Sequence, residues 1–215
     1  MIQVKCFPVN PIQENCYVVN DETGEAVIID CGAYYDFERQ AVTQHIKNNN
    51  LKPVHLLCTH GHFDHVLGND TIFAEFGLKP EIHADDAPFI ADVAKQCRDL
   101  GTGMSYDHPT PPVGQLLADG DIISFGTHHL QVIATPGHSQ GGICFYCPEE
   151  KVIFTGDTLF RMSVGRTDLP GGSWEQLMES IRHLTTTIPS NVKVYPGHGP
   201  ETTMAIEMSA NPYLR

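Results

Sequence analysis

The densest cluster of metal-ligand residue types constrains the fold of this chain more than any other feature. Three histidines and one aspartate lie within six residues, in the segment Cys58-Thr59-His60-Gly61-His62-Phe63-Asp64-His65. The apolar run 54–58 before them predicts a buried strand, and the amphipathic segment 66–76 after them predicts a helix. The four side chains are therefore expected on a tight turn between a strand and a helix.

The spacing within this turn predicts two neighbouring groups of ligands. His60 and His62 are two residues apart, so only the turn itself can bring them together. Asp64 and His65 open the predicted helix and can reach a second point nearby. Neutral imidazoles and a carboxylate are ligands that zinc, iron, manganese and cobalt accept. Packing does not explain the cluster, because burying these groups without partners would cost several kcal/mol.

Composition and charge restrict the class of protein. The chain has 215 residues, 41% hydrophobic and 18% charged, which suits one domain of two or three layers. No linker, charge run or low-complexity segment marks a boundary, so residues 1–215 are interpreted as a single domain. The formal net charge of −13 argues against nucleic acid or an anionic membrane as partner, because both require basic patches. A small-molecule substrate is the expected partner, and the oligomeric state stays open.

The N-terminus and the cysteines indicate a compartment. The first residues contain no long apolar stretch, so no secretory signal is expected, and no run of about 18 apolar residues predicts a membrane span. Seven scattered cysteines are interpreted as reduced thiols of a cytoplasmic protein. Cys144 and Cys147 have the spacing of a CxxC motif. They lie in a predicted strand, where residues three apart point to opposite faces, so no zinc or redox pair is expected.

The first half of the chain predicts strands followed by helices. Strands are expected at 2–7, 16–19, 26–30 and 79–84, and helices at 34–46 and 86–98. Phe37, Ala41 and Ile46 would form the inner face of the first helix, and Asp85 would cap the second. The segment 101–112, rich in glycine and proline, predicts a loop that could lie over the site. His108 within it is interpreted as an exposed loop histidine.

The second half repeats this style. Strands are expected at 121–125, 129–134, 143–146, 152–154 and 192–195, and a last helix at 202–208. Ser173 and Gln176 form a capping box that opens the clearest helix. Its buried face is expected to comprise Trp174, Leu177, Ile181 and Leu184. Two sheet halves, each backed by helices, predict a layered α/β sandwich.

Three later turns carry further ligand residue types. They are Thr135-Pro136-Gly137-His138-Ser139, Thr155-Gly156-Asp157-Thr158 and Tyr195-Pro196-Gly197-His198-Gly199. Each follows a predicted strand and places a glycine beside His138, Asp157 or His198. Glycine permits a sharp turn that points the ligand side chain back over the sheet edge. Together with the first cluster, these turns predict one metal centre.

These motifs resemble those of the metallo-β-lactamase superfamily. The match comprises His60-x-His62-x-Asp64-His65, His138, Asp157 and His198, and it covers nearly the whole chain. The segments 165–172 and 196–200 are most similar to short single-domain members of the glyoxalase II-like branch, the hydroxyacylglutathione hydrolases. The resemblance implies an α/β fold, a four-layer αββα sandwich of two mixed sheets flanked by helices, with the site at one edge.

The resemblance also implies the ligand set and the chemistry. His60, His62 and His138 would hold the first of two divalent metal ions, Asp64, His65 and His198 the second, and Asp157 would bridge them. Zinc is the expected metal, with iron or manganese as alternatives. A metal-bound hydroxide would hydrolyse a thioester of the S-lactoylglutathione type to a hydroxy acid and a thiol. Asp64 would act as the catalytic residue that orients the hydroxide and takes up its proton.

Arg166 is the candidate substrate-binding residue. It matches a basic residue that contacts glutathione in two-domain glyoxalase II enzymes, whereas Asp168 stands where the family has an aromatic contact. The resemblance therefore supports the reaction class better than it supports glutathione as the carrier. The alternative interpretation of Arg166 is a structural ion pair with a neighbouring carboxylate.

Other functions remain open at this stage. The main alternative is a persulfide dioxygenase. The resemblance to that branch would imply a mononuclear iron site on His60, His138 and Asp157. Hydrolysis of a lactone or a phosphodiester is also compatible with the motifs, and a β-lactamase is less expected because the closest motifs point elsewhere. A metal-holding interaction module without activity would be indicated by a missing ligand, and none is missing.

Overall fold

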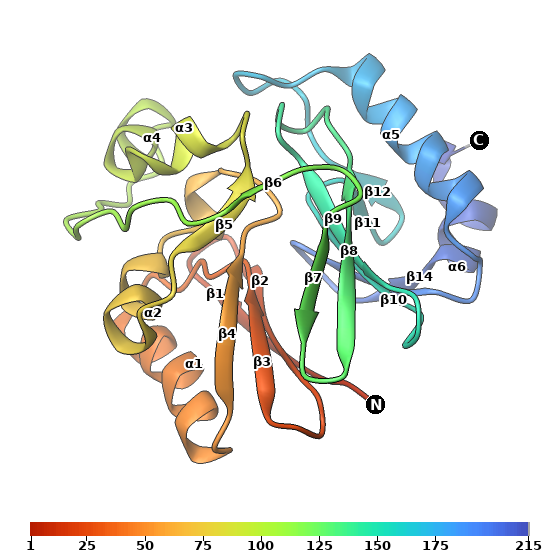
Figure 1. Cartoon of the computed structure of the whole chain (residues 1–215). Coiled ribbons are helices and arrows are strands. Elements are labelled where there is room, and N and C mark those ends of the chain that lie inside the picture. Colours follow the sequence, from red (N-terminus) through yellow and green to blue (C-terminus); the bar gives the residue numbers. More distant parts are fainter. Residues whose placement is uncertain (215) are drawn as a thin grey trace.

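Two six-stranded mixed sheets form the centre of the molecule. The computed structural model, which describes residues 1–214, is drawn in Figure 1. The first sheet has the order β1-β2-β3-β4-β5-β6, antiparallel from β1 to β3 and parallel from β3 to β6. Its strands are β1 (Gln3–Val9), β2 (Glu14–Asn20), β3 (Glu25–Ile29), β4 (Lys52–Leu57), β5 (Pro80–His83) and β6 (Leu116–Leu117).

The second sheet has the order β14-β13-β10-β9-β8-β7. β10 and β13 pair in parallel and the other neighbours pair antiparallel. Its strands are β7 (Ile122–Phe125), β8 (His128–Ala134), β9 (Ile143–Cys147), β10 (Val152–Gly156), β13 (Lys193–Pro196) and β14 (Thr202–Thr203). A separate ribbon joins β11 (Leu159–Phe160) to β12 (Ser163–Val164).

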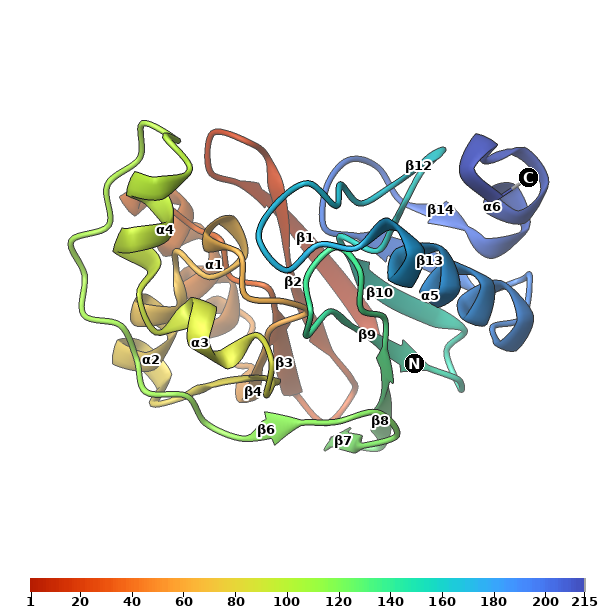
Figure 2. The ribbon, with the colours of Figure 1, turned by 90° about the horizontal axis from the view of Figure 1, so that it is seen from above.

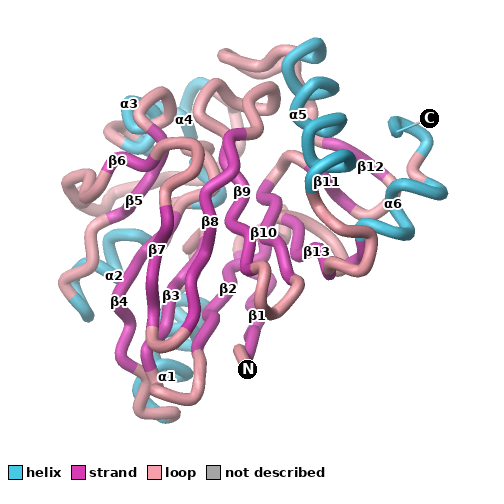
Figure 3. The backbone as a smooth tube through the Cα atoms, turned by 45° about the vertical axis from the view of Figure 1, so that its right-hand side comes forward, coloured by secondary structure: helices cyan, strands magenta, loops and turns pink. Residues whose placement is uncertain are grey.

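Helices cover the outer faces of both sheets, as the tube in Figure 3 shows. On the first sheet lie α1 (Asp36–Asn48), α2 (Asn69–Phe76), α3 (Ala87–Ile90) and α4 (Val93–Asp99). On the second lie α5 (Trp174–Thr187) and α6 (Met204–Ala210). Two short 3₁₀ helices, η1 (Phe63–His65) and η2 (Pro212–Leu214), complete the elements. The αββα sandwich expected from the sequence is confirmed.

The alternation of side chains along each strand divides the apolar residues among three layers. In β2, Val19 packs between the sheets, whereas Val18 faces α1 and α2. In β9, Phe145 packs between the sheets and Cys144 faces α5. Cys147 lies with Phe145, so the two cysteines of the CxxC spacing point to opposite faces, as expected. All seven cysteines are free thiols.

The inner face of α1 differs from the prediction. Phe37 is 68% exposed and Ala41 is also exposed, whereas Ile46 is buried as expected. The buried positions include Glu38 and Arg39. Glu38 accepts hydrogen bonds from backbone amides at the start of the helix, and Arg39 pairs with Asp70 of α2. Apolar periodicity could not reveal this, because charged side chains that are fully paired occupy the face that faces the sheet.

Two helix boundaries were also wrong. The helix predicted over 66–76 begins only at Asn69, and the single 3₁₀ turn η1 carries Asp64 and His65. The helix predicted over 86–98 is two helices, because Asp92 accepts a hydrogen bond from the amide of Lys95 and starts a new helix there.

The clearest helix keeps most of its predicted face. In α5, Leu177, Ile181 and Leu184 are buried as expected, but Trp174 is 50% exposed and packs edge-on against Tyr213. Ser173 accepts from the amide of Gln176 at 3.3 Å, which is the N-cap half of the predicted capping box. Within residues 1–214, no helix is both long and apolar enough to cross a membrane.

Candidate metal centre

The predicted ligand turns all lie at one end of the two sheets. β4 leads into the turn with His60 and His62, and η1 supplies Asp64 and His65. β8, β10 and β13 lead into the turns with His138, Asp157 and His198. Figure 2 looks onto this end of the molecule, where turns from both sheets meet above the strand ends. Each sheet therefore contributes part of one site.

The seven side chains form two groups with an aspartate between them. The nearest ring or carboxylate atoms of His60, His62 and His138 lie within 4.8 Å of one another, and so do those of Asp64, His65 and His198. Asp157 contacts both groups. Its Oδ2 is 3.5 Å from His138 Nε2 and 3.7 Å from His198 Nε2, and its Oδ1 is 3.3 Å from His65 Nε2. This is the position that a bridging carboxylate requires.

Hydrogen bonds on the far side of the rings determine which nitrogen faces the site. His138 Nδ1 lies 2.7 Å from the carbonyl oxygen of Arg166, and a carbonyl only accepts, so this nitrogen carries the proton. His65 Nδ1 donates in the same way to Asp30 Oδ2 at 3.0 Å. When such a ring is neutral, its Nε2 presents a lone pair to the site, as the ligating nitrogen of a metal-bound histidine does.

Two further rings are oriented by the same logic. The hydroxyl of Thr59 donates to Asp30 at 2.7 Å, so its oxygen accepts from His60 Nδ1 at 3.1 Å. His198 Nδ1 lies 3.2 Å from the carbonyl oxygen of Ile12. His60, His65 and His138 thus hold a proton on Nδ1 and turn Nε2 toward the site, whereas both nitrogens of His198 lie near acceptors, because its Nε2 is 3.1 Å from Asp64 Oδ2. The fifth, His62, faces the site with Nδ1, 2.8 Å from His138 Nε2.

The site contains buried polar atoms that the protein leaves unpaired. His60 Nε2, His65 Nε2 and Asp157 Oδ1 have no hydrogen-bond partner among residues 1–214. Buried polar atoms are normally paired, and orphaned ones indicate a missing ion or water. Converging imidazole lone pairs and carboxylate oxygens form the donor set that two divalent cations of the zinc or iron type need. The residues present therefore fit a binuclear metal site.

The pKa values of the histidines in the metal-free site support the same interpretation. Burial lowers the pKa of His60 well below its ordinary value, and burial together with His138 lowers that of His62 to about 4. Burial also disfavours charge on His65, but Asp157, Asp64 and Asp30 outweigh it and raise its pKa well above the usual range. The carboxylates thus require positive charge at this point, which either a proton or a metal ion supplies.

Three buried acidic residues that sequence reasoning missed lie around the ligand turns, and two of them, Asp30 and Asp86, bond these turns directly. Asp30 accepts from the amide and hydroxyl of Thr59 and from His65. Glu14 accepts from the amide of Gly32 at 3.2 Å, and burial raises its pKa well above the ordinary value. Asp30 follows a predicted strand beside a glycine, which was a usable signal. Glu14 carried none.

The third, Asp86, joins the ligand turns of the two sheets. Its Oδ2 accepts from the amide of Gly61 at 2.9 Å, and its Oδ1 accepts from the amide of Gly141 at 2.7 Å. Gly61 lies between His60 and His62, and Gly141 lies three residues after His138. The carboxylate is fully buried. Nothing in its sequence context pointed to this role, because both partners are distant in the chain.

The last ligand turn is held by the beginning of the chain. The side-chain amide of Asn15 donates to the carbonyls of Pro196 and Gly199 at 3.0 and 2.8 Å, and its backbone amide donates to that of Gly197 at 2.7 Å. The hydroxyl of Tyr17 also donates to Pro196 at 2.7 Å. His198 is thereby fixed across the interface between the two sheets.

Two glycines in the ligand turns are required by close contacts. Gly137 has a φ of +135°, and a Cβ there would lie 2.2 Å from the backbone nitrogen of Leu177. A Cβ on Gly197 would lie 2.3 Å from Asp157 Oδ1 and 2.7 Å from His65 Cε1. Both agree with the expectation that glycine allows these turns to fold back tightly.

A cavity of about 510 Å³ opens above the metal centre. Its lining includes five of the predicted ligands and Arg166, together with Ile12, Phe160, Leu100 and Leu169. The predicted ligands among them are His62, Asp64, His138, Asp157 and His198. Asp64 Oδ2 lies 3.1 Å from His198 Nε2. A substrate in this cavity would contact the ligand atoms directly.

Arg166 and the loop 101–112 both border this cavity. The guanidinium of Arg166 forms an exposed ion pair with Asp168 at 2.6 Å, which is the structural alternative considered for it. Its side chain nevertheless lines the cavity. Thr102 of the loop lines the cavity too, whereas His108 is 49% exposed and lies 3.4 Å from Asp70.

Comparison with known families agrees with the geometry. The family model described as "Metallo-beta-lactamase superfamily" matches residues 9–198. "Probable metallo-hydrolase YqgX" of Bacillus subtilis is 34% identical over 97% of this chain and 95% of its own length. "Hydroxyacylglutathione hydrolase GloC" of Haemophilus influenzae is 31% identical over 99% and 98%.

Solved structures of similar proteins share the complete fold. One, titled "Crystal structure of BLEG-1 B3 metallo-beta-lactamase", superposes with a TM-score of 0.89 at 36% identity and covers 99% of both chains. Another, titled "Crystal structure of TTHA1623 in a di-iron-bound form", has a TM-score of 0.86 at 36% identity, covering 98% of this chain and 100% of that one. Proteins of this fold and similarity thus include one that holds two iron ions.

Proposed function

This chain belongs to the metallo-β-lactamase superfamily, and from that premise we propose that it is a glyoxalase II-like thioesterase, a metallo-hydrolase that binds two divalent metal ions. One observation carries the proposal. Ring nitrogens of five imidazoles and a carboxylate oxygen of Asp64 meet at two adjacent points, with Asp157 in contact with both groups. A cluster of this kind serves no packing purpose, because several of its buried atoms are left unpaired.

The ligands divide into two sets in this proposal. His60, His62 and His138 would hold one ion, Asp64, His65 and His198 would hold the other, and Asp157 would serve both. When bound, such ions lower the pKa of water to about 7 and polarise a carbonyl oxygen. Zinc is the first candidate, and the di-iron form of a protein 36% identical to this one makes iron a real alternative.

Asp64 is proposed to act as the general base that accepts a proton from the attacking water. Asp64 lines the cavity, and its Oδ2 lies 3.1 Å from His198 Nε2 and 3.5 Å from His65 Nε2. A water molecule beside Asp64 Oδ2 is oriented by a hydrogen bond to that oxygen. It gives a proton to Oδ2 as its own oxygen forms a bond to the carbonyl carbon of the thioester. The carbon–sulfur bond then breaks and a thiolate leaves. It needs no proton from an acid, because a thiol of pKa about 8.5 has a thiolate that is stable enough to leave by itself.

A thioester is the preferred substrate because of the motif resemblance and one relative. The Haemophilus influenzae relative is named a hydroxyacylglutathione hydrolase. A second candidate is β-lactam hydrolysis, which is favoured by the 36% identical structure titled as a B3 metallo-β-lactamase. Both reactions add water to an acyl carbon, so the same residues would serve either. The exposed pair of Arg166 with Asp168 leaves the carrier thiol open.

One experiment separates these functions. The protein is purified, its metal content per chain is measured, and it is assayed with S-lactoylglutathione, with simple acyl thioesters, with a chromogenic β-lactam, and with glutathione persulfide under an oxygen electrode. Two metals per chain with thioester turnover would support the proposal. Inertness of the metal-loaded protein toward every acyl thioester would refute it. A single iron with persulfide-dependent oxygen uptake would replace it with a dioxygenase.

The proposed setting follows from composition. Seven free cysteines fit a reducing compartment, so we propose the cytoplasm. The net charge of −13 supports a small-molecule partner rather than nucleic acid or an anionic membrane. Equilibrium binding to DNA or to anionic vesicles at physiological salt tests this, and we expect none.

A further inference from the structure

A second cavity of about 330 Å³ lies beside the metal centre. We call it the α4 pocket. Its apolar lining comprises Pro88, Phe89, Leu100, Leu169 and Pro170, and its other lining residues are His62, Asp92, Lys95, Gln96 and Asp99. His62, Leu100 and Leu169 line both this pocket and the cavity above the metal centre, so the two are direct neighbours. The α4 pocket therefore lies within reach of a molecule bound over the candidate ligands.

The wall of the α4 pocket is fixed to the ligand turn by Gln96. The side-chain amide nitrogen of Gln96 donates to the carbonyls of Gly61 and Phe89 at 2.9 and 2.7 Å, and its oxygen accepts from the amide of Phe63 at 3.1 Å. Gly61 and Phe63 flank His62. The ring of Phe89 meets that of His62 edge-on at 6.2 Å. The pocket thus has a defined position relative to the candidate ligands.

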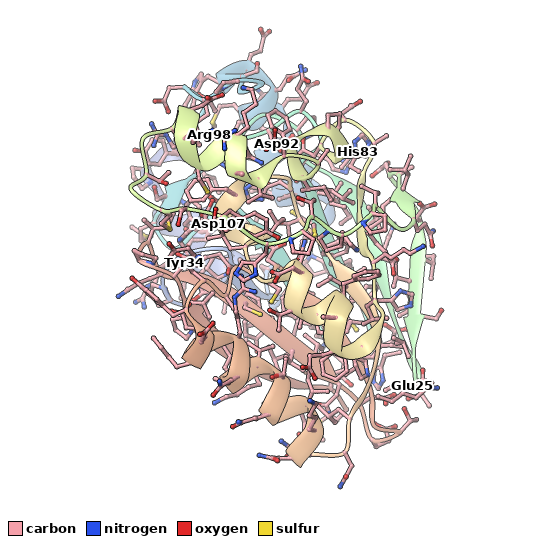
Figure 4. The ribbon with its side chains drawn as sticks, turned by 90° about the vertical axis from the view of Figure 1, so that its left-hand side faces the viewer. Glu25, Tyr34, His83, Asp92, Arg98 and Asp107 are labelled. Atoms are coloured by element: carbon pink, nitrogen blue, oxygen red, sulfur yellow. The ribbon has the colours of Figure 1, made fainter. Side chains whose placement is uncertain are left out.

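The polar residues of the pocket are already paired. Lys95 forms an ion pair with Asp99, and both are largely exposed. Asp92 accepts from the amide of Lys95 at 2.8 Å as the cap of α4. Figure 4 shows α4 from outside, with Asp92 and Arg98 near its two ends. The pocket therefore offers no unpaired cation to the carboxylates of a carrier such as glutathione. Polar groups placed against its apolar wall would lose their hydration without gaining partners.

We propose that the α4 pocket binds an apolar group joined to the scissile thioester, a medium-length aliphatic chain or an aromatic ring. Substrate pockets are mainly apolar with a few polar groups that fix orientation, and this pocket has that character beside the candidate reaction centre. The inference rests on the proposed thioesterase function and narrows it. The preferred substrates are thioesters more apolar than S-lactoylglutathione, with Phe89, Leu100 and Leu169 setting the preference.

The first test varies the apolar group on each side of the scissile bond. Acetyl, butyryl, hexanoyl, octanoyl and phenylacetyl thioesters of N-acetylcysteamine are compared, and then acetyl thioesters of thiols of increasing length. We expect kcat/KM to rise about fourfold per added methylene in one series until the pocket is full. The series that rises identifies the acyl or the thiol side. Equal kcat/KM values along both series would overturn the inference.

A matched pair of variants localises the effect. Leu100→Gln places a polar group in the pocket and is expected to lower the octanoyl-to-acetyl ratio of kcat/KM about tenfold, or the corresponding ratio of the thiol series. Leu116→Gln changes an exposed leucine of β6 outside the pocket and should leave that ratio unchanged. Because the readout is a ratio, partial loss of folded protein does not affect it. Equal ratios in the two variants would contradict the inference.

Binding without turnover separates this inference from the proposed function. Metal-free protein is titrated by calorimetry with intact octanoyl and acetyl thioesters of N-acetylcysteamine and with an octyl thioester of acetate. We expect at least tenfold tighter binding of one octyl-bearing compound than of the acetyl compound, and loss of that difference in Leu100→Gln. Binding without thioester turnover in the metal-loaded protein would refute the function and keep the pocket. Thioester turnover without any preference for the longer chain would support the proposed function and refute the role of the α4 pocket.

Discussion

Two clusters of histidine and carboxylate lie at opposite ends of the sheets, and only one has the character of a metal site. The turns that join β2 to β3 and β7 to β8 lie at the bottom of Figure 1, away from the ligand turns. There Asp21, Glu22 and His128 bring their polar atoms within 4.8 Å of one another, as the two ligand groups of the metal centre do. Proximity alone does not distinguish the two ends.

The hydrogen bonds do distinguish them. His128 Nδ1 lies 3.1 Å from Asp21 Oδ2, and its Nε2 lies 2.9 Å from Glu150 Oε1, so both ring nitrogens face carboxylates of the protein. Asp21 also accepts from Thr23 and Thr127. In the metal centre, by contrast, His60 and His65 each bond the protein through Nδ1 and leave a buried Nε2 without a hydrogen-bond partner among residues 1–214. The comparison teaches that unpaired buried atoms, more than ligand residue types, mark a place for a foreign ion.

The largest expected effect is the loss of the bridging carboxylate. Asp157→Ala should reduce metal content below two per chain and lower kcat/KM for the best substrate at least about 10³-fold, roughly 4 kcal/mol of barrier. Metal analysis and steady-state kinetics measure both. Asp21→Ala at the other cluster should leave metal content unchanged. If Asp157→Ala retained two ions and full activity, the centre as described here would be wrong.

Removing an outer carboxylate should have an intermediate effect. Asp30→Ala deletes the acceptor for His65 and Thr59 while leaving all seven candidate ligands in place. We expect a 10- to 100-fold loss of metal affinity, the usual consequence of losing such a partner. Competition with a chelator measures it, and Asp21→Ala is again the matched control. Equal metal affinity in the two variants would remove the distinction drawn between the clusters.

Asp86 tests whether a paired carboxylate near the metal centre behaves like those of the far cluster. Asp86→Ala leaves two buried amides without an acceptor, and we expect a loss of about 2 kcal/mol in the free energy of unfolding of the metal-free protein. Chemical denaturation measures it. Asp86→Asn keeps the volume and one acceptor oxygen and should lose less. A loss no larger in the alanine variant than in the asparagine variant would show that the link between the turns is dispensable.

The cluster of Asp21, Glu22 and His128 should affect the pH dependence of the free energy of unfolding, with no change in metal binding. Burial opposes charge on His128, but hydrogen bonds to Asp21 and Glu150 outweigh it and raise its pKa above 6.5. Its stabilisation is therefore fully present below pH 6.5 and is lost as pH rises through the raised pKa. The stability difference between the wild-type protein and His128→Asn should shrink between pH 6 and pH 9, by at most about 1 kcal/mol. A constant difference would show that the pair carries no charge.

The smallest effect is expected at Arg166. Its ion pair with Asp168 is exposed, so Arg166→Ala should change the free energy of unfolding by less than about 1 kcal/mol. The backbone carbonyl that orients His138 remains in the variant, so metal content should not change. If the guanidinium binds an anionic carrier, KM for glutathione thioesters rises while KM for N-acetylcysteamine thioesters does not. If KM for glutathione thioesters is the same in Arg166→Ala as in the wild-type protein, Arg166 has only a structural role.

The sequence predicted which candidate ligands come together better than it predicted the residues that support them. His60, His138, Asp157 and His198 each stand in a short local pattern of strand, glycine and ligand, and local patterns are readable along one chain. Asp86 and Glu14 act through partners far away in sequence, so nothing near them indicated a role. Phe37 and Trp174 were placed in buried faces by periodicity alone. Periodicity assigns a face, but paired charges such as Arg39 can occupy it instead.

The attachment of the final ligand turn to Asn15 and Tyr17 has a consequence for the order of folding. These two residues lie 179 to 184 positions from their partners Pro196 and Gly199. Contacts of such long sequence separation form late, because the intervening chain must first lose entropy. The candidate ligands from His60 to His65 are neighbours in sequence, whereas His198 reaches them only when the two sheets have docked. The complete set of candidate ligands is therefore expected to assemble in the last step of folding.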